Sequence, residues 1–185
     1  APKPVVHVAV PRRPSASSGR GGLLYTTQER CPVCGGVFPA ARVAMSRLRV
    51  EAREPDLYVR YSPVDPNLYQ VWVCPGCGYA APQGAFAPLY PDERERAAGA
   101  ALSLREDPRL LGEILPLDLA PAGEPEPLPD QQPLPDPAGG ERTFEQALAA
   151  YRRALYFSRV RRNKHGIAGG LYLRLAWLFR ARGEA

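Results

Sequence analysis

The sequence has few of the side chains that enzymes use for acid–base chemistry. It contains two histidines, His7 in an N-terminal arm and His165 in the polar turn before Gly166. A histidine in such a turn is usually exposed to solvent and inert. The glycine-containing segments lack the lysine of a phosphate-binding loop, and the clustered carboxylates lie in a proline-rich segment where nothing raises their pKa. The sequence therefore predicts that the protein is not an enzyme.

Long apolar runs are also missing. No stretch approaches the roughly 20 apolar residues that cross a bilayer, and residues 1–10 lack the basic and hydrophobic regions of a secretory signal. We therefore expect a cytoplasmic protein without membrane contact. Thiols stay reduced in that compartment, where paired cysteines are more often metal ligands than disulfides.

Cysteine is scarce, and all four cysteines fall in two copies of one motif, Cys31–Gly35 and Cys74–Gly78, which both read C-P-x-C-G. Two residues between the cysteines let both sulfurs of a tight turn face one ion. The glycine permits a positive φ that turns its N–H back toward the sulfurs. Two such turns, called knuckles below, supply four thiolates for a tetrahedral site. We predict one structural Zn²⁺ bound by Cys31, Cys34, Cys74 and Cys77.

Other uses of the four cysteines have less support. The same knuckles occur in rubredoxin-type Fe(Cys)₄ proteins, so iron is the alternative metal, although rubredoxins are shorter and acidic. A disulfide pair conflicts with a reducing compartment. Catalytic zinc is disfavoured because four thiolates close the coordination shell, whereas catalysis needs an open position for water.

Proline and glycine, with 22 and 17 residues, mark the organisation of the chain. Segment 120–140 holds seven prolines, four acidic residues and no basic residue, a composition that predicts an extended linker without a core. We expect a flexible basic arm at 1–22, a zinc-ribbon-like module at 23–90, a helical extension at 91–119, the acidic linker at 120–140 and a C-terminal helical hairpin at 141–185.

The metal module should be built from strands. They are expected at 23–27, 47–53 and 69–73, with a long loop at 54–67. Alternation along the second strand places Leu48, Val50 and Ala52 on its buried face.

Helices should follow the metal module. Pro91 and the acidic residues after it begin a helix that ends near Asp107. Apolar stripes predict a hairpin of two helices, at 141–160 and 171–182, with a break at 166–170. Its alanine and aromatic spacing matches part of a tetratricopeptide repeat (TPR), although a solenoid needs about three repeats.

The net charge of +5 is small, but its distribution is uneven. A basic cluster crowds the end of the first hairpin helix and comprises Arg152, Arg153, Arg159, Arg161, Arg162 and Lys164. These cations exceed what helix capping needs, so the cluster is a candidate RNA or DNA surface. A second candidate combines Arg47, Arg49 and Arg53 with Arg60 and Trp72, because arginines and aromatics hold phosphates and stack on bases.

A solvated charged face is the alternative for both basic surfaces. In that case the aromatic side chains of the hairpin, Tyr172 and Phe179 among them, become the leading contact surface for a protein partner.

Several motifs, in this order, resemble an uncharacterised bacterial family, domain of unknown function 2225 (DUF2225). They are the first knuckle, residues 46–53, residues 69–81 with the second knuckle, and residues 173–177. The resemblance covers roughly 25–90 and 143–182, and the acidic linker departs from the family pattern. It implies a cytoplasmic metal-binding protein and no particular reaction.

Together the sequence predicts an α+β fold with a small antiparallel zinc-ribbon-like module, a proline-rich linker and a TPR-like helical hairpin. The favoured function is a non-enzymatic, zinc-binding interaction or adaptor protein with a protein partner. An RNA- or DNA-binding protein that uses residues 152–164 is the alternative, and a rubredoxin-like electron carrier is a third. The sequence does not determine the oligomeric state.

Overall fold

The computed structural model describes residues 22–112, 114, 140–161 and 165–183. The expected arm at 1–22 and linker at 120–140 therefore lie almost wholly outside the described residues. Arg162 and Lys164 of the basic cluster also lie outside them.

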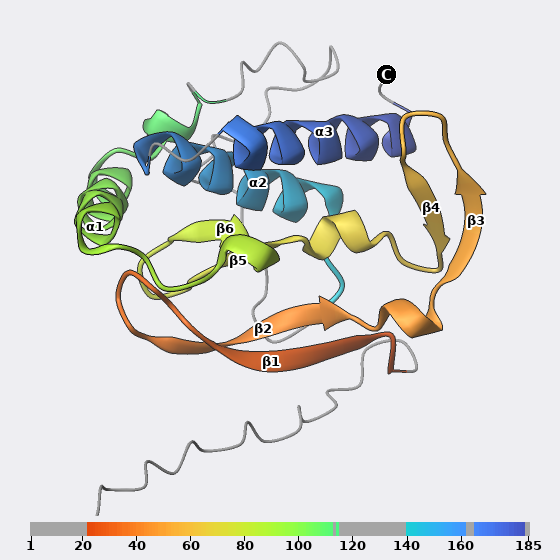
Figure 1. Ribbon diagram of the computed structural model, residues 1–185, viewed down its shortest axis with the longest axis horizontal. Helices are drawn as coiled ribbons and strands as arrows, with labels where there is room; N and C mark the ends of the chain where they lie inside the picture. Colours follow the sequence, from red (N-terminus) through yellow and green to blue (C-terminus); the bar gives the residue numbers. More distant parts are fainter. Residues whose placement is uncertain (1–21, 113, 115–139, 162–164, 184–185) are drawn as a thin grey trace, which may run out of the picture.

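The described part of the chain is mixed α and β, with small antiparallel strand pairs and three α-helices (Figure 1). The pairs are β1 (Leu24–Arg30) with β2 (Val37–Val43), β3 (Arg49–Arg53) with β4 (Val59–Ser62), and β5 (Val71–Val73) with β6 (Ala80–Pro82). Short 3₁₀ turns, η2 (Met45–Arg47), η3 (Pro66–Tyr69), η4 (Gln83–Ala85) and η5 (Pro108–Leu111), connect the larger elements. Among the described residues, these elements by themselves establish neither the predicted zinc-ribbon-like sheet nor a TPR-like repeat.

The helices begin where the sequence provides N-terminal signals. α1 (Pro91–Glu106) has proline in its first turn, as predicted, and Asp107 ends it. α2 (Phe144–Val160) is preceded by a capping box in which Thr143 and Gln146 bond reciprocally, so that two backbone N–H groups at this end are satisfied. α3 (His165–Arg182) runs antiparallel to α2, with Arg182 paired to Glu145 and Phe179 packed on Phe144.

Three details of the sequence-based prediction are wrong. The expected helix break at 166–170 does not form, because α3 continues through all three glycines of that segment. The expected loop at 54–67 contains β4, and Val50 on β3 is 42% exposed rather than buried. The β3–β4 hairpin carries a register shift between Val50 and Ala52 and covers little of the core, so alternation alone overstated its burial.

The helices and the knuckle hairpins pack as layers around one core (Figure 1). α2 lies between β5–β6 on one side and α3 on the other, with β1–β2 beneath β5–β6 and α1 at one end. Trp72 on β5 joins the two hairpins by donating its indole N–H to the Ala41 carbonyl at 3.1 Å. Residues of 23–90 and of 141–185, which the sequence suggests as separate segments, therefore share this core.

Polar contacts between β5 and the start of α2 reinforce this packing. Arg142 is 8% exposed, and its guanidinium donates to the Val71 carbonyl at 2.8 Å and lies over the ring of Tyr69. The Tyr151 hydroxyl donates to the carbonyl of Asn67 at 2.9 Å. The helix is thus anchored to the segment that leads into the second knuckle.

Candidate metal centre

Each knuckle is the turn of a β-hairpin. Cys31 follows the last residue of β1, and Cys74 follows the last residue of β5. In the first knuckle the Cys31 N–H donates to the Gly36 carbonyl at 2.8 Å, and the Gly35 N–H donates to the Cys31 carbonyl at 2.9 Å. The second knuckle repeats both bonds between the equivalent residues, so strand pairing delivers two turns of the same shape.

The glycines after Cys34 and Cys77 adopt the conformation that the sequence predicts. Gly35 has φ +76° and Gly78 has φ +75°, in the left-handed region that favours glycine. Their N–H groups point to the carbonyls of Cys31 and Cys74, however, and not to the sulfurs as expected. The glycines therefore close the turn, while other backbone amides meet the sulfur atoms.

The four sulfur atoms converge at one point. All lie within 4.8 Å of one another, with Cys31 Sγ 3.6 Å from Cys77 Sγ and Cys34 Sγ 3.7 Å from Cys74 Sγ. Zinc–sulfur bonds of about 2.3 Å in a tetrahedron separate neighbouring sulfurs by about 3.8 Å, whereas a disulfide holds them at about 2.05 Å. The two short separations fit ligands of one ion, and the residues present therefore fit a tetrahedral metal site.

Hydrogen bonds within the cluster shift the pKa values of its thiols in opposite directions. Bonds from the Cys31 and Cys77 thiols lower the pKa of Cys74, and backbone N–H groups of Cys77 and Gly76 also point at its sulfur. The pKa of Cys77 is raised because its thiol donates to its neighbours and burial disfavours its thiolate. A metal ion binds thiolates, so it must displace the protons that these thiols share.

The centre lies at the edge of the core. Cys31 and Cys74 are buried, Cys77 is half-buried and Cys34 is exposed. α1 supports the first knuckle, because Arg94 donates through Nε to the Val33 carbonyl at 3.1 Å. The metal ligands are therefore held by a helix as well as by the hairpins.

Tyr79, which follows the second knuckle, connects the centre to α2. Its backbone carbonyl accepts from the Cys74 N–H at 2.8 Å, and its ring packs edge-on against Phe157 with 5.0 Å between centroids. Its hydroxyl accepts a hydrogen bond from Arg161 at 2.6 Å. Burial raises the pKa of Tyr79 to about 12, so the hydroxyl stays protonated. The sequence analysis assigned no role to this residue.

Comparison with known proteins identifies one family. The family described as an uncharacterized protein conserved in bacteria (DUF2225) matches residues 24–185, which include both knuckles and all three helices. The chain belongs to this family. No curated protein and no solved structure matches it. The DUF2225 assignment confirms the resemblance seen in the sequence and extends it across the segment between the two matching blocks.

The described members of the basic cluster face into the DUF2225 fold more than outward. Arg152 is 4% exposed. Arg161 bonds Tyr79 and lies 3.7 Å from Glu93 of α1. Arg159 is exposed and donates to the Tyr172 hydroxyl at 3.1 Å, and Arg153 is half-buried on α2. The structure does not gather these side chains into one exposed basic face among the described residues.

The second candidate surface is also incomplete. Trp72 is 2% exposed and its ring is covered by Arg42, so no base can stack on it. Arg60 pairs with Glu54 at 2.8 Å, whereas Arg49 is largely exposed.

Of the two histidines, His7 lies outside the described residues and His165 begins α3.

The DUF2225 helices give no sign of a membrane segment. Within the described ranges, none combines the length and the apolar character that crossing a bilayer would require.

Proposed function

We propose that this chain is a non-enzymatic, zinc-binding interaction protein, in which one structural Zn²⁺ fixes the fold and the outer face of α3 contacts a protein partner in the cytoplasm. The observation that carries this proposal is that α3 has apolar side chains on two opposite sides. Leu171, Leu175 and Leu178 are buried against the core, yet Tyr172 is 39% and Leu173 44% exposed. A helix that is apolar all round normally has both faces covered.

The metal centre supports a structural role for the ion. Four thiolates complete a tetrahedral shell and leave no position for substrate or water. Zinc is the proposed ion, and iron is the alternative because the same donor set holds it in electron carriers. Elemental analysis of protein purified without added metal tests the choice: about one equivalent of zinc is expected, and iron with visible thiolate absorbance would contradict it.

Binding of RNA or DNA is the second candidate, and it now has less support. Its main observation is the arginine cluster at the end of α2, in which Arg159 and Arg161 bond within the fold and Arg152 is buried. A nucleic-acid site would show affinity that falls steeply with salt, because each phosphate contact releases counterions.

Paired variants on two helices test the protein-binding face. Leu173→Glu places a charge on the outer face of α3, and Leu102→Glu places one at a residue of α1 that is 60% exposed. We expect a bacterial protein to be retained stoichiometrically by wild type and Leu102→Glu, with nuclease present, and to be lost with Leu173→Glu. Zinc content should be equal in all three. Equal retention by both variants, or retention that nuclease abolishes, would contradict the proposal.

A further inference from the structure

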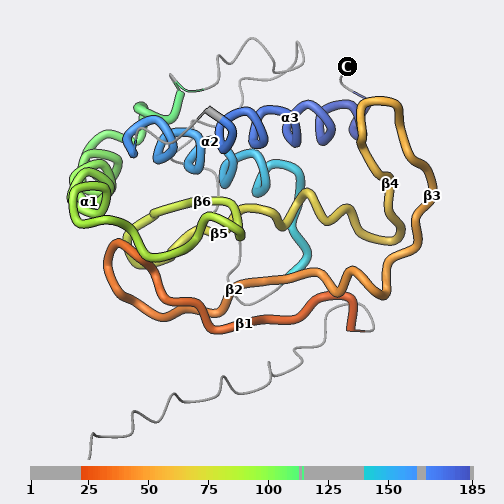
Figure 2. Tube along the Cα trace, viewed as in Figure 1, coloured from red at the N-terminus to blue at the C-terminus, as the bar shows by residue number. Residues whose placement is uncertain are grey.

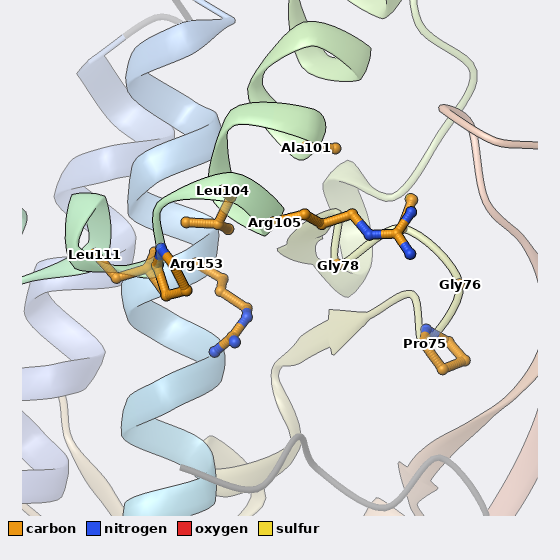
Figure 3. A pocket seen from close by; sticks show the side chains of 10 residues that line it. Pro75, Gly76, Gly78, Ala101, Leu104, Arg105, Leu111 and Arg153 are labelled. Carbon is orange, nitrogen blue, oxygen red and sulfur yellow. The ribbon is translucent and has the colours of Figure 1, made fainter. Parts of the chain in front are cut away.

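A cavity lies beside the second knuckle, and Cys77 of that knuckle is part of its lining. It has a volume of about 310 Å³ and lies between α1, η5, α2 and the turn at 75–78 (Figure 3). Leu104, Leu111 and Ala101 form an apolar wall, and the lining also includes two cations, the exposed Arg105 and the half-buried Arg153. A concave, partly apolar site with a few polar groups is typical of a small-molecule site.

The two arginines come from different helices. Figure 3 shows Arg105 extending from α1 toward the turn that holds Gly76 and Gly78, and Arg153 extending from α2 below Leu104. No acidic residue lines the cavity within the described part of the chain. Neither arginine forms an ion pair with a described residue. Arg161, at the end of α2, does: it lies 3.7 Å from Glu93.

Arg153 is costly in this position unless something compensates its charge. Its Nη1 is buried and has no hydrogen-bond partner among the described residues. Burial lowers the pKa of Arg153, and no nearby carboxylate counteracts that effect in the described residues. A guanidinium placed in a partly dry site attracts an anion more strongly than an exposed one, because less solvent screens it.

Charge compensation of the metal centre is the competing explanation. A Zn(Cys)₄ centre carries a formal charge of about −2, and Cys77 borders the cavity. Neither Arg105 nor Arg153, however, donates to a cysteine sulfur within the described ranges. The thiolates are instead met by knuckle amides, including those of Gly76 and Cys77. No hydrogen bond therefore commits either arginine to a sulfur atom within the described part of the chain.

We propose that this cavity binds a small organic oxyanion, with a carboxylate or phosphate group held by Arg105 and Arg153 and an apolar body against Leu104 and Leu111. Guanidinium groups bind both oxyanions through paired, charge-assisted hydrogen bonds. The apolar wall selects ligands larger than an inorganic ion. This site is separate from the α3 face, so it stands whether or not a protein partner binds there.

Amide NMR of the zinc-loaded full chain tests the site. The probes are benzoate, phenyl phosphate, inorganic phosphate and the neutral benzyl alcohol. We expect saturable shifts of the Gly76 and Gly78 amides with benzoate or phenyl phosphate, and weaker ones with inorganic phosphate and benzyl alcohol. The stronger of the two aromatic anions identifies the oxyanion that the arginines prefer.

Three arginine variants complete the test. Arg105→Gln and Arg153→Gln should each weaken binding about tenfold or more, the loss expected for one hydrogen bond to a charged group. Arg109→Gln, an exposed residue on η5 outside the cavity lining, should leave it unchanged. Zinc content and circular dichroism confirm folding of each variant. Absence of saturable shifts, equal weakening by Arg109→Gln, or a loss of zinc affinity in the cavity variants without any anion binding would overturn the proposal.

Discussion

Gly35 and Gly78 are the residues on which the shape of the two knuckles depends. Both have positive φ, and a side chain added at either position meets no atom within 4 Å. Gly78→Ala should therefore cost backbone strain alone, about 1 kcal/mol. Because metal binding is coupled to the folded turn, we expect zinc affinity to fall roughly five- to tenfold in a competition titration.

Gly84→Ala is the matched control for this change. Gly84 also has open space around it, but its φ is not in the left-handed region. Zinc affinity and the free energy of unfolding should stay within about 0.5 kcal/mol of wild type. If both alanine variants bind zinc equally, positive φ is not what makes the glycine necessary.

The cluster of four cysteines is the part of the site that the sequence predicts best. Cys31 and Cys74 lie in short local motifs, and a CxxC spacing fixes the geometry of its own turn. The arginines of α2 were harder to interpret, because charge alone does not show which way a side chain points. Helical spacing contained a signal: Arg152 lies four residues after Leu148 and three before Leu155, both buried, and so shares their face.

The β3–β4 hairpin is an element attached to the rest mainly through its tip (Figure 2). Asp56 accepts hydrogen bonds from Arg180 at 2.7 Å and from the Trp177 indole at 2.9 Å, and Tyr58 stacks on Trp177. This contact fixes the hairpin against the C-terminal end of α3. The sequence could not predict it, because the partners are 121 and 124 residues apart.

Asp56→Asn should release the hairpin tip without unfolding the molecule. An exposed ion pair contributes little to global stability, so we expect faster amide hydrogen exchange at 54–60 and an almost unchanged melting temperature. Asp92→Asn, which removes a pair within α1, should leave exchange at 54–60 as in wild type. Exchange at the tip that is equally slow in both variants would show that ring stacking alone holds it.

Low pH should weaken the same contact between the hairpin tip and α3. The bond from Arg180 lowers the pKa of Asp56 below its ordinary value. Such a contact is fully present above the unfolded pKa of about 3.9 and is lost as the pH falls through the lower folded value. The tip should therefore stay attached across neutral and mildly acidic pH.

Helix type and position followed from sequence better than helix ends did. The proline and acidic first turn of α1 are local signals, and the structure bears them out. The glycines of α3 are also local signals, but the helix forms across them because Leu171, Leu175 and Leu178 pack on the core. Burial of such a row outweighs about 1 kcal/mol of helix propensity lost per glycine.

At the scale of the whole molecule, the metal centre and the helices should lose structure together. Tyr79 joins the second knuckle to α2, and Arg94 joins the first to α1. Removing the ion with a chelator, or by Cys34→Ser, should therefore lower the helical signal in circular dichroism as well as disorder the hairpins, in a single cooperative transition. Zinc added back should restore both.

Separate behaviour of the two parts would contradict this expectation. If α2 and α3 keep their full ellipticity after the metal is removed, the segments at 23–90 and 141–185 are independent units, as the proline-rich linker suggests from sequence alone. Limited proteolysis of the metal-free protein would then release a protected helical fragment.

Cys34 and Cys74 are separated by 39 residues, yet each knuckle forms its own turn within its own hairpin. The intervening chain therefore has to bring the knuckles together without shaping either one. Lengthening a connection costs little, about 0.6 kcal/mol of closure entropy for each doubling. The hairpin tip at Leu57, which is 80% exposed, is thus the place where evolution or an engineer can insert new sequence. Such an insertion would give up the contact of the tip with α3 but not the coordination of the ion.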